Sequence, residues 1–146
     1  MNTRERLVPL CDAFVGNTCV MLDRDPYVAE RRLLYGRAGE YRLPKYGLEY
    51  RVPSNFWLRS YPLMSLVFGL TKLAVCTLYT TVGASTTEPC SSWYTHQPTE
   101  IDFKPWDAEG TLLKALDPEV LREAINTNNL ELAKANYKKV RDFIVD

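Results

Sequence analysis

The feature that most constrains the fold of this chain is the apolar stretch from Tyr61 to Val82. It is long enough to cross a bilayer as a helix, since about 20 apolar residues suffice. Lys72 stands near its centre, however, and a charge there is costly in hydrocarbon. The apolar residues recur at spacings of three and four, with Ser60 placed as an N-cap and Pro62 in the first turn. We therefore predict a mostly buried helix of a globular domain and no membrane contact.

Two shorter helices are predicted before this stretch. Residues 4–14 form an amphipathic pattern, and Gly16 is placed as its C-cap. Asp25 followed by Pro26 is typical of a helix N-terminus, with the acid as N-cap and the proline at the first helical position. This second helix is expected to stop at Gly36.

The chain beyond the apolar stretch divides into two parts. Residues 83–106 are rich in Ser, Thr and Pro, which predicts a long loop or lid. The pattern then becomes helical again, with an N-cap at Asp117 and a last helix over 130–144. We expect this helical tail, residues 107–146, to pack on the domain formed by residues 1–82 or on a partner.

Two strands are predicted between the second helix and the apolar stretch. Residues 39–43 and 48–52 flank Pro44-Lys45-Tyr46-Gly47, whose residue types favour a turn. A hairpin closed by this turn, together with the surrounding helices, makes the predicted fold class α+β, an antiparallel sheet with packed helices.

The hairpin register places four charged residues on one face. Side chains alternate along a strand, so Leu48, Tyr50 and Val52 point to the opposite face. With the turn given above, the facing pairs are Arg42 with Glu49, and Glu40 with Arg51.

Net charge and composition exclude several classes of function. The 18 basic residues balance 18 acidic ones, so no global attraction to nucleic acid or to anionic lipid is expected. A single histidine excludes a His-rich metal cage. Cys11, Cys19 and Cys76 stand in apolar stretches, and none of the four cysteines forms a C-x-x-C pair, which predicts buried thiols rather than a zinc site. The first residues are not a signal peptide, so we expect a cytoplasmic protein with reduced thiols.

Basic and aromatic residues are concentrated between positions 31 and 59, and three explanations fit this concentration. The first is a set of solvated cross-strand ion pairs, each contributing well under about 1 kcal/mol. The second is nucleic-acid binding, although no RNA-binding signature appears. The third is a nucleotide-phosphate site, in which Glu49 ligates Mg²⁺ and Arg51 binds phosphoryl oxygens. The basic residues of this segment are Arg31, Arg32, Arg37, Arg42, Lys45, Arg51 and Arg59.

Two long motifs carry a resemblance to a known family. They are RR-x-x-Y-G-x-A-G-x-x-R over residues 31–42 and G-x-E-Y-R-x-x-S-N-F-W over residues 47–57. Through them the chain, from about Leu7 to Val75, resembles the phage-type carboxylate–amine ligases. These are the type 2 amidoligases, relatives of glutamine synthetase and glutamate–cysteine ligase.

The resemblance implies a ligase that uses ATP to activate a carboxylate as an acyl phosphate, which an amine then attacks to form an amide. It implies that Glu49 holds Mg²⁺, that Arg51 stabilises the transferred phosphoryl group, and that Arg42 contacts phosphate or the acyl phosphate from the same face. It also implies a glutamine-synthetase-like catalytic sheet. The residues expected to bind or shape the site for nucleotide or substrate are Arg32, Arg37 and Tyr35.

The same resemblance predicts an incomplete enzyme. Members of the family carry an acidic motif and a His-containing motif upstream of this region, and Glu49 with Glu40 is too little to bind two Mg²⁺ ions. His96 lies downstream, in the predicted loop, and does not match that motif. We therefore expect residues 1–82 to be the C-terminal half of an amidoligase domain, acting as a partial or split enzyme with a separately encoded N-terminal half.

The expected partners are a small-molecule or peptide carboxylate and an amine, with no nucleic acid and no membrane, in the host cytoplasm if the chain is phage-encoded. The alternative is a non-catalytic interaction or structural remnant of the fold. A nucleic-acid-binding module is the third hypothesis.

Overall fold

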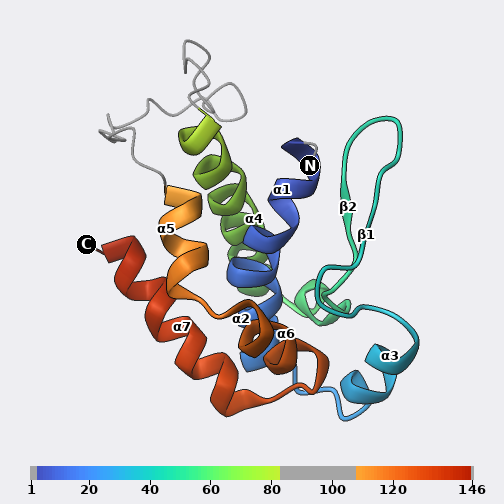
Figure 1. The fold of residues 1–146 in the computed structure, drawn as a ribbon. Coiled ribbons are helices and arrows are strands. Elements are labelled where there is room, and N and C mark those ends of the chain that lie inside the picture. Colours follow the sequence, from blue (N-terminus) through green and yellow to red (C-terminus); the bar gives the residue numbers. More distant parts are fainter. Residues whose placement is uncertain (1–2, 83–107, 146) are drawn as a thin grey trace.

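The computed structural model describes residues 3–82 and 108–145. In these residues the fold is mainly helical with one two-stranded antiparallel sheet, which is compatible with the predicted α+β class (Figure 1). The glutamine-synthetase-like attribution stays a prediction. The predicted loop at 83–106, with His96, lies outside the described residues. The elements are α1 (Thr3–Cys11), η1 (Asp12–Gly16), α2 (Asn17–Leu22), α3 (Val28–Leu34), β1 (Tyr41–Arg42), β2 (Glu49–Tyr50), η2 (Phe56–Arg59), α4 (Tyr61–Val82), α5 (Ala108–Ala115), α6 (Pro118–Asn126) and α7 (Leu130–Val145).

The N-terminal helix runs through the glycine at which it was expected to end. Gly16 has helical backbone angles, φ −58° and ψ −50°, and joins the π-helical turn η1 to α2. A Cβ at this position would lie 2.5 Å from the Tyr50 hydroxyl and 3.0 Å from Ile125 Cδ1. The prediction of a C-cap at Gly16 is therefore wrong, because this glycine serves the close approach of the hairpin and α6 rather than a chain reversal.

Helix α3 begins at Val28, two residues later than the Pro26 start predicted from an N-cap at Asp25. The Asp25 carboxylate accepts a hydrogen bond from the backbone N–H of Tyr27 at 2.9 Å, so it closes a turn that leads into the helix. The helix ends at Leu34, and Gly36 follows with a φ of +84°, as expected for a glycine that terminates a helix. The predicted stop is confirmed, and the predicted start is wrong by two residues.

Helix α4 confirms the predicted long helix but not its predicted burial. The Ser60 carbonyl accepts a hydrogen bond from Met64 N–H at 3.1 Å, which fits the N-cap position. Only 17% of the window Tyr61–Leu78 is buried, and Phe68 is 70% exposed. Helix α4 contacts α1 and α5 on one side and leaves an apolar side uncovered by the described residues. By length and composition, α4 is the one described helix that could span a membrane. The core helix of a soluble protein can meet the same criterion.

The C-terminal helices begin and end where the sequence predicted. The Asp117 carboxylate accepts hydrogen bonds from the N–H groups of Glu119 and Val120, at 2.9 and 3.4 Å. Asn128 takes a φ of +53° at the break, and the Asn129 side chain caps α7. Helix α7 packs on α2 and α6, so the tail packs on the preceding helices (Figure 1).

One apolar core joins both described segments. It includes Leu10 and Phe14 from the N-terminal helix, Leu112 from α5, and Ile125 from α6. Burying such side chains contributes about 1.5–3 kcal/mol each. The predicted burial of Cys11 and Cys19 is confirmed, whereas Cys76 is only partly buried. The hairpin and α3 lie at the edge of this helical body (Figure 1).

Candidate functional site

The hairpin has the register that the alternation of its residues predicted. Tyr41 pairs with Tyr50, and Arg42 pairs with Glu49. Beyond the assigned strands, the N–H of Arg51 donates to the Glu40 carbonyl at 3.0 Å, so the pairing continues. The four charged side chains therefore share one face, as expected from a period of two.

Ion pairs link the charged residues on that face. Arg42 donates to Glu49 Oε2, with Nε at 2.9 Å. Arg51 Nε lies 3.4 Å from Glu49 Oε1, and Arg51 Nη1 lies 3.7 Å from Glu40 Oε1. We call this group, together with Tyr35 and Arg31, the arginine cluster. Each of its carboxylates is engaged by a guanidinium, so the cluster is pre-arranged by its own charges.

Tyr35 holds two of these guanidinium groups. Arg51 Nε donates to the Tyr35 hydroxyl at 3.1 Å, and its guanidinium carbon lies 4.3 Å from the ring centroid. The guanidinium carbon of Arg31 lies 4.7 Å from the same centroid. The ring attracts both cations, a contact that contributes about 0.5–1 kcal/mol at exposed sites. Tyr35 therefore orients Arg51, and its predicted role at a nucleotide or substrate site stays a prediction.

Arg31 fixes the backbone that follows β2, a role the sequence did not reveal. Its guanidinium donates to the carbonyls of Val52 at 3.0 Å, Arg51 at 3.3 Å and Pro53 at 3.0 Å. A Cβ on Gly36 would overlap this guanidinium, so the glycine keeps the space for it. The only sequence signal was membership in the Arg31-Arg32 pair, which does not say which arginine faces the hairpin.

Arg32 and Arg37 donate hydrogen bonds mainly to backbone carbonyls. Arg32 is 3% exposed and donates to the Ile125 carbonyl and, at 3.2 Å, to Asn128 Oδ1. Burial lowers its pKa from the ordinary arginine value. Arg37 donates to the carbonyls of Arg32 and Leu33, each at 3.0 Å, and so caps the C-terminus of α3. Arg32 thus connects α3 to the end of α6, and neither guanidinium takes part in the ion pairs of the arginine cluster.

The arginine cluster suits an anion better than a metal ion. Its three guanidinium groups outnumber its two carboxylates, and Glu49 stands between two cations. Mg²⁺ prefers several oxygen ligands. In the part of the chain that the structure describes, no three His, Cys, Asp or Glu residues form a group able to hold a metal ion. The described residues therefore do not make a Mg²⁺ site by themselves.

A buried carboxyl group on the other face of the hairpin was missed by the sequence analysis. Asp12, in η1, is 6% exposed, and its Oδ1 accepts hydrogen bonds from the Tyr50 hydroxyl at 2.6 Å and from Gly39 N–H at 3.1 Å. Burial raises the pKa of Asp12 to about 6, although these two hydrogen bonds and the charge of Arg122 lower it. Burial also raises the pKa of Tyr50 well above its ordinary value.

Two observations mark Asp12 as a functional candidate. A π-helical turn inside a longer helix is frequent at functional sites, and a buried acid with a shifted pKa is a second such sign. The only sequence signal was one acid inside the apolar run from Cys11 to Val15.

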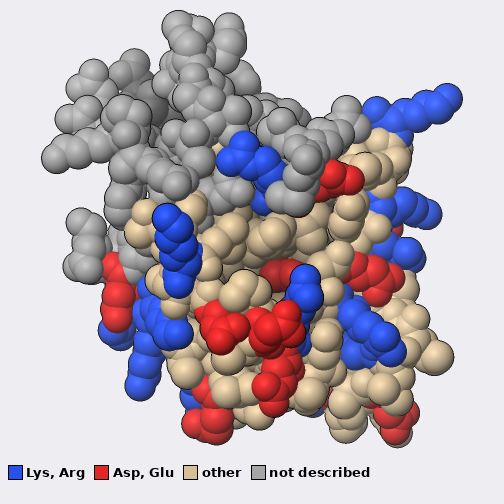
Figure 2. All heavy atoms as spheres, viewed as in Figure 1, with Lys and Arg blue, Asp and Glu red and all other residues tan. Residues whose placement is uncertain are grey.

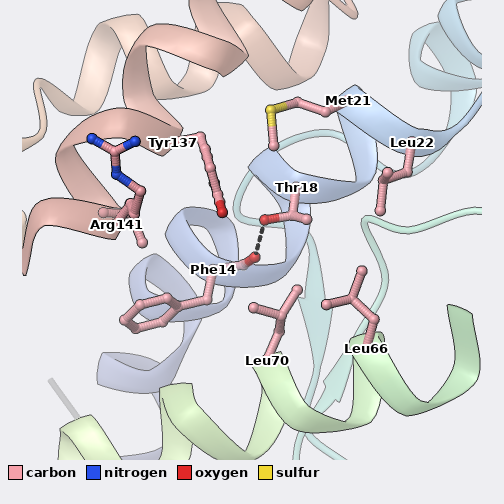
Figure 3. Close-up of a pocket in the computed structure, with 9 residues that line it drawn as sticks. Phe14, Thr18, Met21, Leu22, Leu66, Leu70, Tyr137 and Arg141 are labelled. Atoms are coloured by element: carbon pink, nitrogen blue, oxygen red, sulfur yellow. Dashed lines mark hydrogen bonds between the residues drawn. The ribbon is translucent and has the colours of Figure 1, made fainter. Parts of the chain in front are cut away.

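Two hollows adjoin the N-terminal helix. One, of about 460 Å³, is lined by Asp12 and by residues of α1, the hairpin, α5 and α6. The other, of about 570 Å³, lies between α2, α4 and α7 (Figure 3). In the close-up, Leu66 and Leu70 of α4 face the N-terminal helix, where the Thr18 hydroxyl donates to the Phe14 carbonyl at 2.7 Å. This second hollow is mostly apolar, and no carboxylate lines it.

Charged side chains of both signs cover the visible face of the molecule. Figure 2 shows acidic side chains grouped in the centre of the view, over α6. Basic side chains lie on both sides of this group, near the hairpin and α3 and over α7, with acidic side chains among them.

Comparison with known proteins identifies the family. A family model described as phage phiEco32-like COOH.NH2 ligase, type 2, matches residues 1–98. The chain belongs to this family. Searches of curated proteins and of solved structures found no match. Both the arginine cluster and Asp12 fall within the part that matches this carboxylate–amine ligase family, whereas α5, α6 and α7 follow it.

Proposed function

We propose that this member of the family acts in ATP- and Mg²⁺-dependent amide-bond formation through an acyl phosphate, with the arginine cluster binding phosphoryl oxygens. The observation that carries the proposal is the convergence of Arg31, Arg42 and Arg51 around Tyr35 and the hairpin, within the family match. The expected substrates are a small-molecule or peptide carboxylate and an amine.

Arg51 and Arg42 have complementary properties for this role. A planar guanidinium matches two phosphoryl oxygens at once. Arg51 is held in place by Tyr35, so little freedom is lost when it binds a ligand. Arg42 is 62% exposed, and its pair with Glu49 contributes at most about 1 kcal/mol, so an incoming phosphate can take over its guanidinium.

Metal binding requires groups beyond the described residues. Both oxygens of Glu49 already face guanidinium groups, and no group of three metal-ligating residues lies in the described ranges. Glu49 would become a Mg²⁺ ligand only together with further carboxylates. The split-enzyme hypothesis places these carboxylates on a second polypeptide.

The alternative, a non-catalytic remnant of the fold, is favoured by one observation. Glu40 and Glu49, the carboxylates of the cluster, are neutralised within the chain, as they would be in a purely structural network. Under this alternative the ion pairs have no ligand, and changes to them alter neither nucleotide affinity nor activity.

Calorimetric titration with ATP, with and without MgCl₂, distinguishes the two. We expect the wild-type protein to bind ATP without Mg²⁺, and Arg51→Met to lower the affinity by about tenfold or more, since one charge-assisted hydrogen bond contributes about 1.5–3 kcal/mol. Arg141→Gln is the matched control, because Arg141 is an exposed arginine paired with its neighbour Asp142. Absence of ATP binding to the wild-type protein favours the non-catalytic alternative, and equal affinities for wild type and Arg51→Met remove Arg51 from the site.

A further inference from the structure

The hollow beside Asp12 combines one enclosed acid with one exposed base. Asp12 lies at its α1 side, in η1, and Arg122 of α6 lines it as well. Glu5 and Tyr41 complete the polar lining, and the Tyr41 hydroxyl donates to Glu5 Oε1 at 3.2 Å. A hollow of about 460 Å³ falls in the usual size range of small-molecule sites.

Asp12 presents one carboxylate oxygen to this hollow. Both of its hydrogen bonds among the described residues end on Oδ1. The nearest atom to a Cβ built on Gly39 is Asp12 Oδ2, at 3.8 Å, so the glycine leaves the space beside this oxygen open. Asp12 Oδ2 is not among the buried polar atoms that lack a hydrogen-bond partner, so a ligand that donates a hydrogen bond can reach it from the hollow.

The rest of the lining is apolar. Leu113 of α5, Leu116 just after it, Leu121 of α6 and Val8 of α1 contribute most of it. Such walls accept a hydrocarbon group. Asp12 can accept a further hydrogen bond from a donor or a cation, and Arg122, whose pair with Glu119 is exposed, can exchange that partner for an anion. A molecule with an ammonium group, a carboxylate and an apolar side chain can contact Asp12, Arg122 and the apolar walls at the same time.

We propose that this hollow binds an amino acid with an apolar side chain, its ammonium group on Asp12 and its carboxylate toward Arg122. Its role as the site of the amine substrate rests on the proposed function, whereas binding itself does not. The ammonium-binding residue lies inside the part of the chain that matches the family, and the carboxylate-binding residue lies beyond it. The C-terminal helices would then select the amine substrate.

The test uses L-leucine and two molecules that each lack one of its charged groups. Isopentylamine lacks the carboxylate, and 4-methylpentanoate lacks the ammonium group. Binding to the full chain is measured by ligand-observed NMR in the absence of ATP, at up to about 10 mM, which covers weak affinities. We expect L-leucine to bind more tightly than either half-molecule.

Two variants separate the charged contacts. Asp12→Asn keeps an oxygen for Tyr50 and Gly39 but replaces the other with an NH₂ group, so we expect it to lower affinity for L-leucine and isopentylamine by about tenfold or more. Arg122→Gln should weaken L-leucine and 4-methylpentanoate and leave isopentylamine unchanged. Arg122 is an exposed residue paired with Glu119, so this variant tests the proposal even if Asp12→Asn does not fold. Arg141→Gln is the control for both.

Clear outcomes overturn the proposal. If neither L-leucine nor isopentylamine binds the wild-type protein, or if both variants bind L-leucine as the wild type does, the hollow is not an amino-acid site. This failure is distinct from failure of the proposed function, which is judged from ATP binding at Arg51. Loss of L-leucine binding in Arg122→Gln with 4-methylpentanoate unaffected contradicts the assigned orientation.

Discussion

The two faces of the hairpin hold their charges in opposite environments. On one face, Glu49 and Arg51 belong to the arginine cluster, where half-exposed groups neutralise one another. On the other face, Tyr50 lies between them in sequence and donates to Asp12, a single acid with no arginine or lysine among its hydrogen-bond partners. Exposed ion pairs change stability little and are free to exchange partners with a ligand. An enclosed carboxylate lowers stability and is expected where function requires it.

The largest loss of stability is expected at Gly36, which leaves space for the Arg31 guanidinium. Gly36→Ala places a Cβ against the Arg31 guanidinium at a φ of +84°, so we expect the free energy of unfolding to fall by about 3 kcal/mol. Gly47→Ala is the matched control, because no heavy atom outside its immediate neighbours lies within 4 Å of its Cβ. Urea denaturation measures both. Equal losses for the two variants would show that Arg31 does not hold the hairpin.

The enclosed acid predicts a gain in stability with a defined pH dependence. Asp12 titrates near 3.8 when unfolded and near 6 when folded, so the folded state binds more protons between these values and stability falls as pH rises through them. Asp12→Asn removes this loss. We expect no difference from wild type below about pH 4 and an advantage of up to about 3 kcal/mol above about pH 6.

Urea denaturation at several pH values checks this prediction. Tyr50→Phe provides a second variant, because it removes a hydrogen bond that lowers the pKa of Asp12 and should therefore strengthen the pH dependence. A difference between Asp12→Asn and wild type that does not vary with pH contradicts the assigned burial.

A smaller effect should separate two arginines of the first motif, Arg32 and Arg37. Arg32→Met removes a charged hydrogen bond to the Ile125 carbonyl, which keeps only the Asn128 N–H at 3.2 Å, and we expect a loss of about 2 kcal/mol in unfolding free energy. Arg37→Met removes an exposed helix cap and should lose less than about 1 kcal/mol. If ATP affinity falls with Arg32→Met while stability is unchanged, Arg32 is a ligand-binding residue after all.

The smallest effect is expected for the most exposed pair. Arg42→Gln breaks the ion pair with Glu49 and should change unfolding free energy by less than about 1 kcal/mol, because solvent screens both groups. Thermal denaturation at low and high salt measures this change. A loss of several kcal/mol would show that the ion pairs on this face of the hairpin contribute substantially to stability, contrary to the difference expected between its two faces.

Local rules predicted those parts of the fold that local interactions determine. The turn residues and the alternation of side chains predicted the pairing of Arg42 with Glu49. Asp117 and the asparagines at 126–129 marked helix ends, because caps act within one turn of the chain. Gly16 and Gly36 show the limit of such rules: both were assigned as helix ends, and only Gly36 is one, since a glycine also permits close approach to distant residues.

The sequence by itself determined α4 and the C-terminal helices, the hairpin register, the family motifs and the grouping of charged residues on one strand face. Only the tertiary structure decided that Arg31 holds the hairpin while its neighbour Arg32 is buried against α6, and that α4 leaves one side exposed. It also decided that Asp12 is enclosed beside Tyr50. The physical reason is that burial and pKa depend on groups far apart in the chain, and no local pattern records which of them come together.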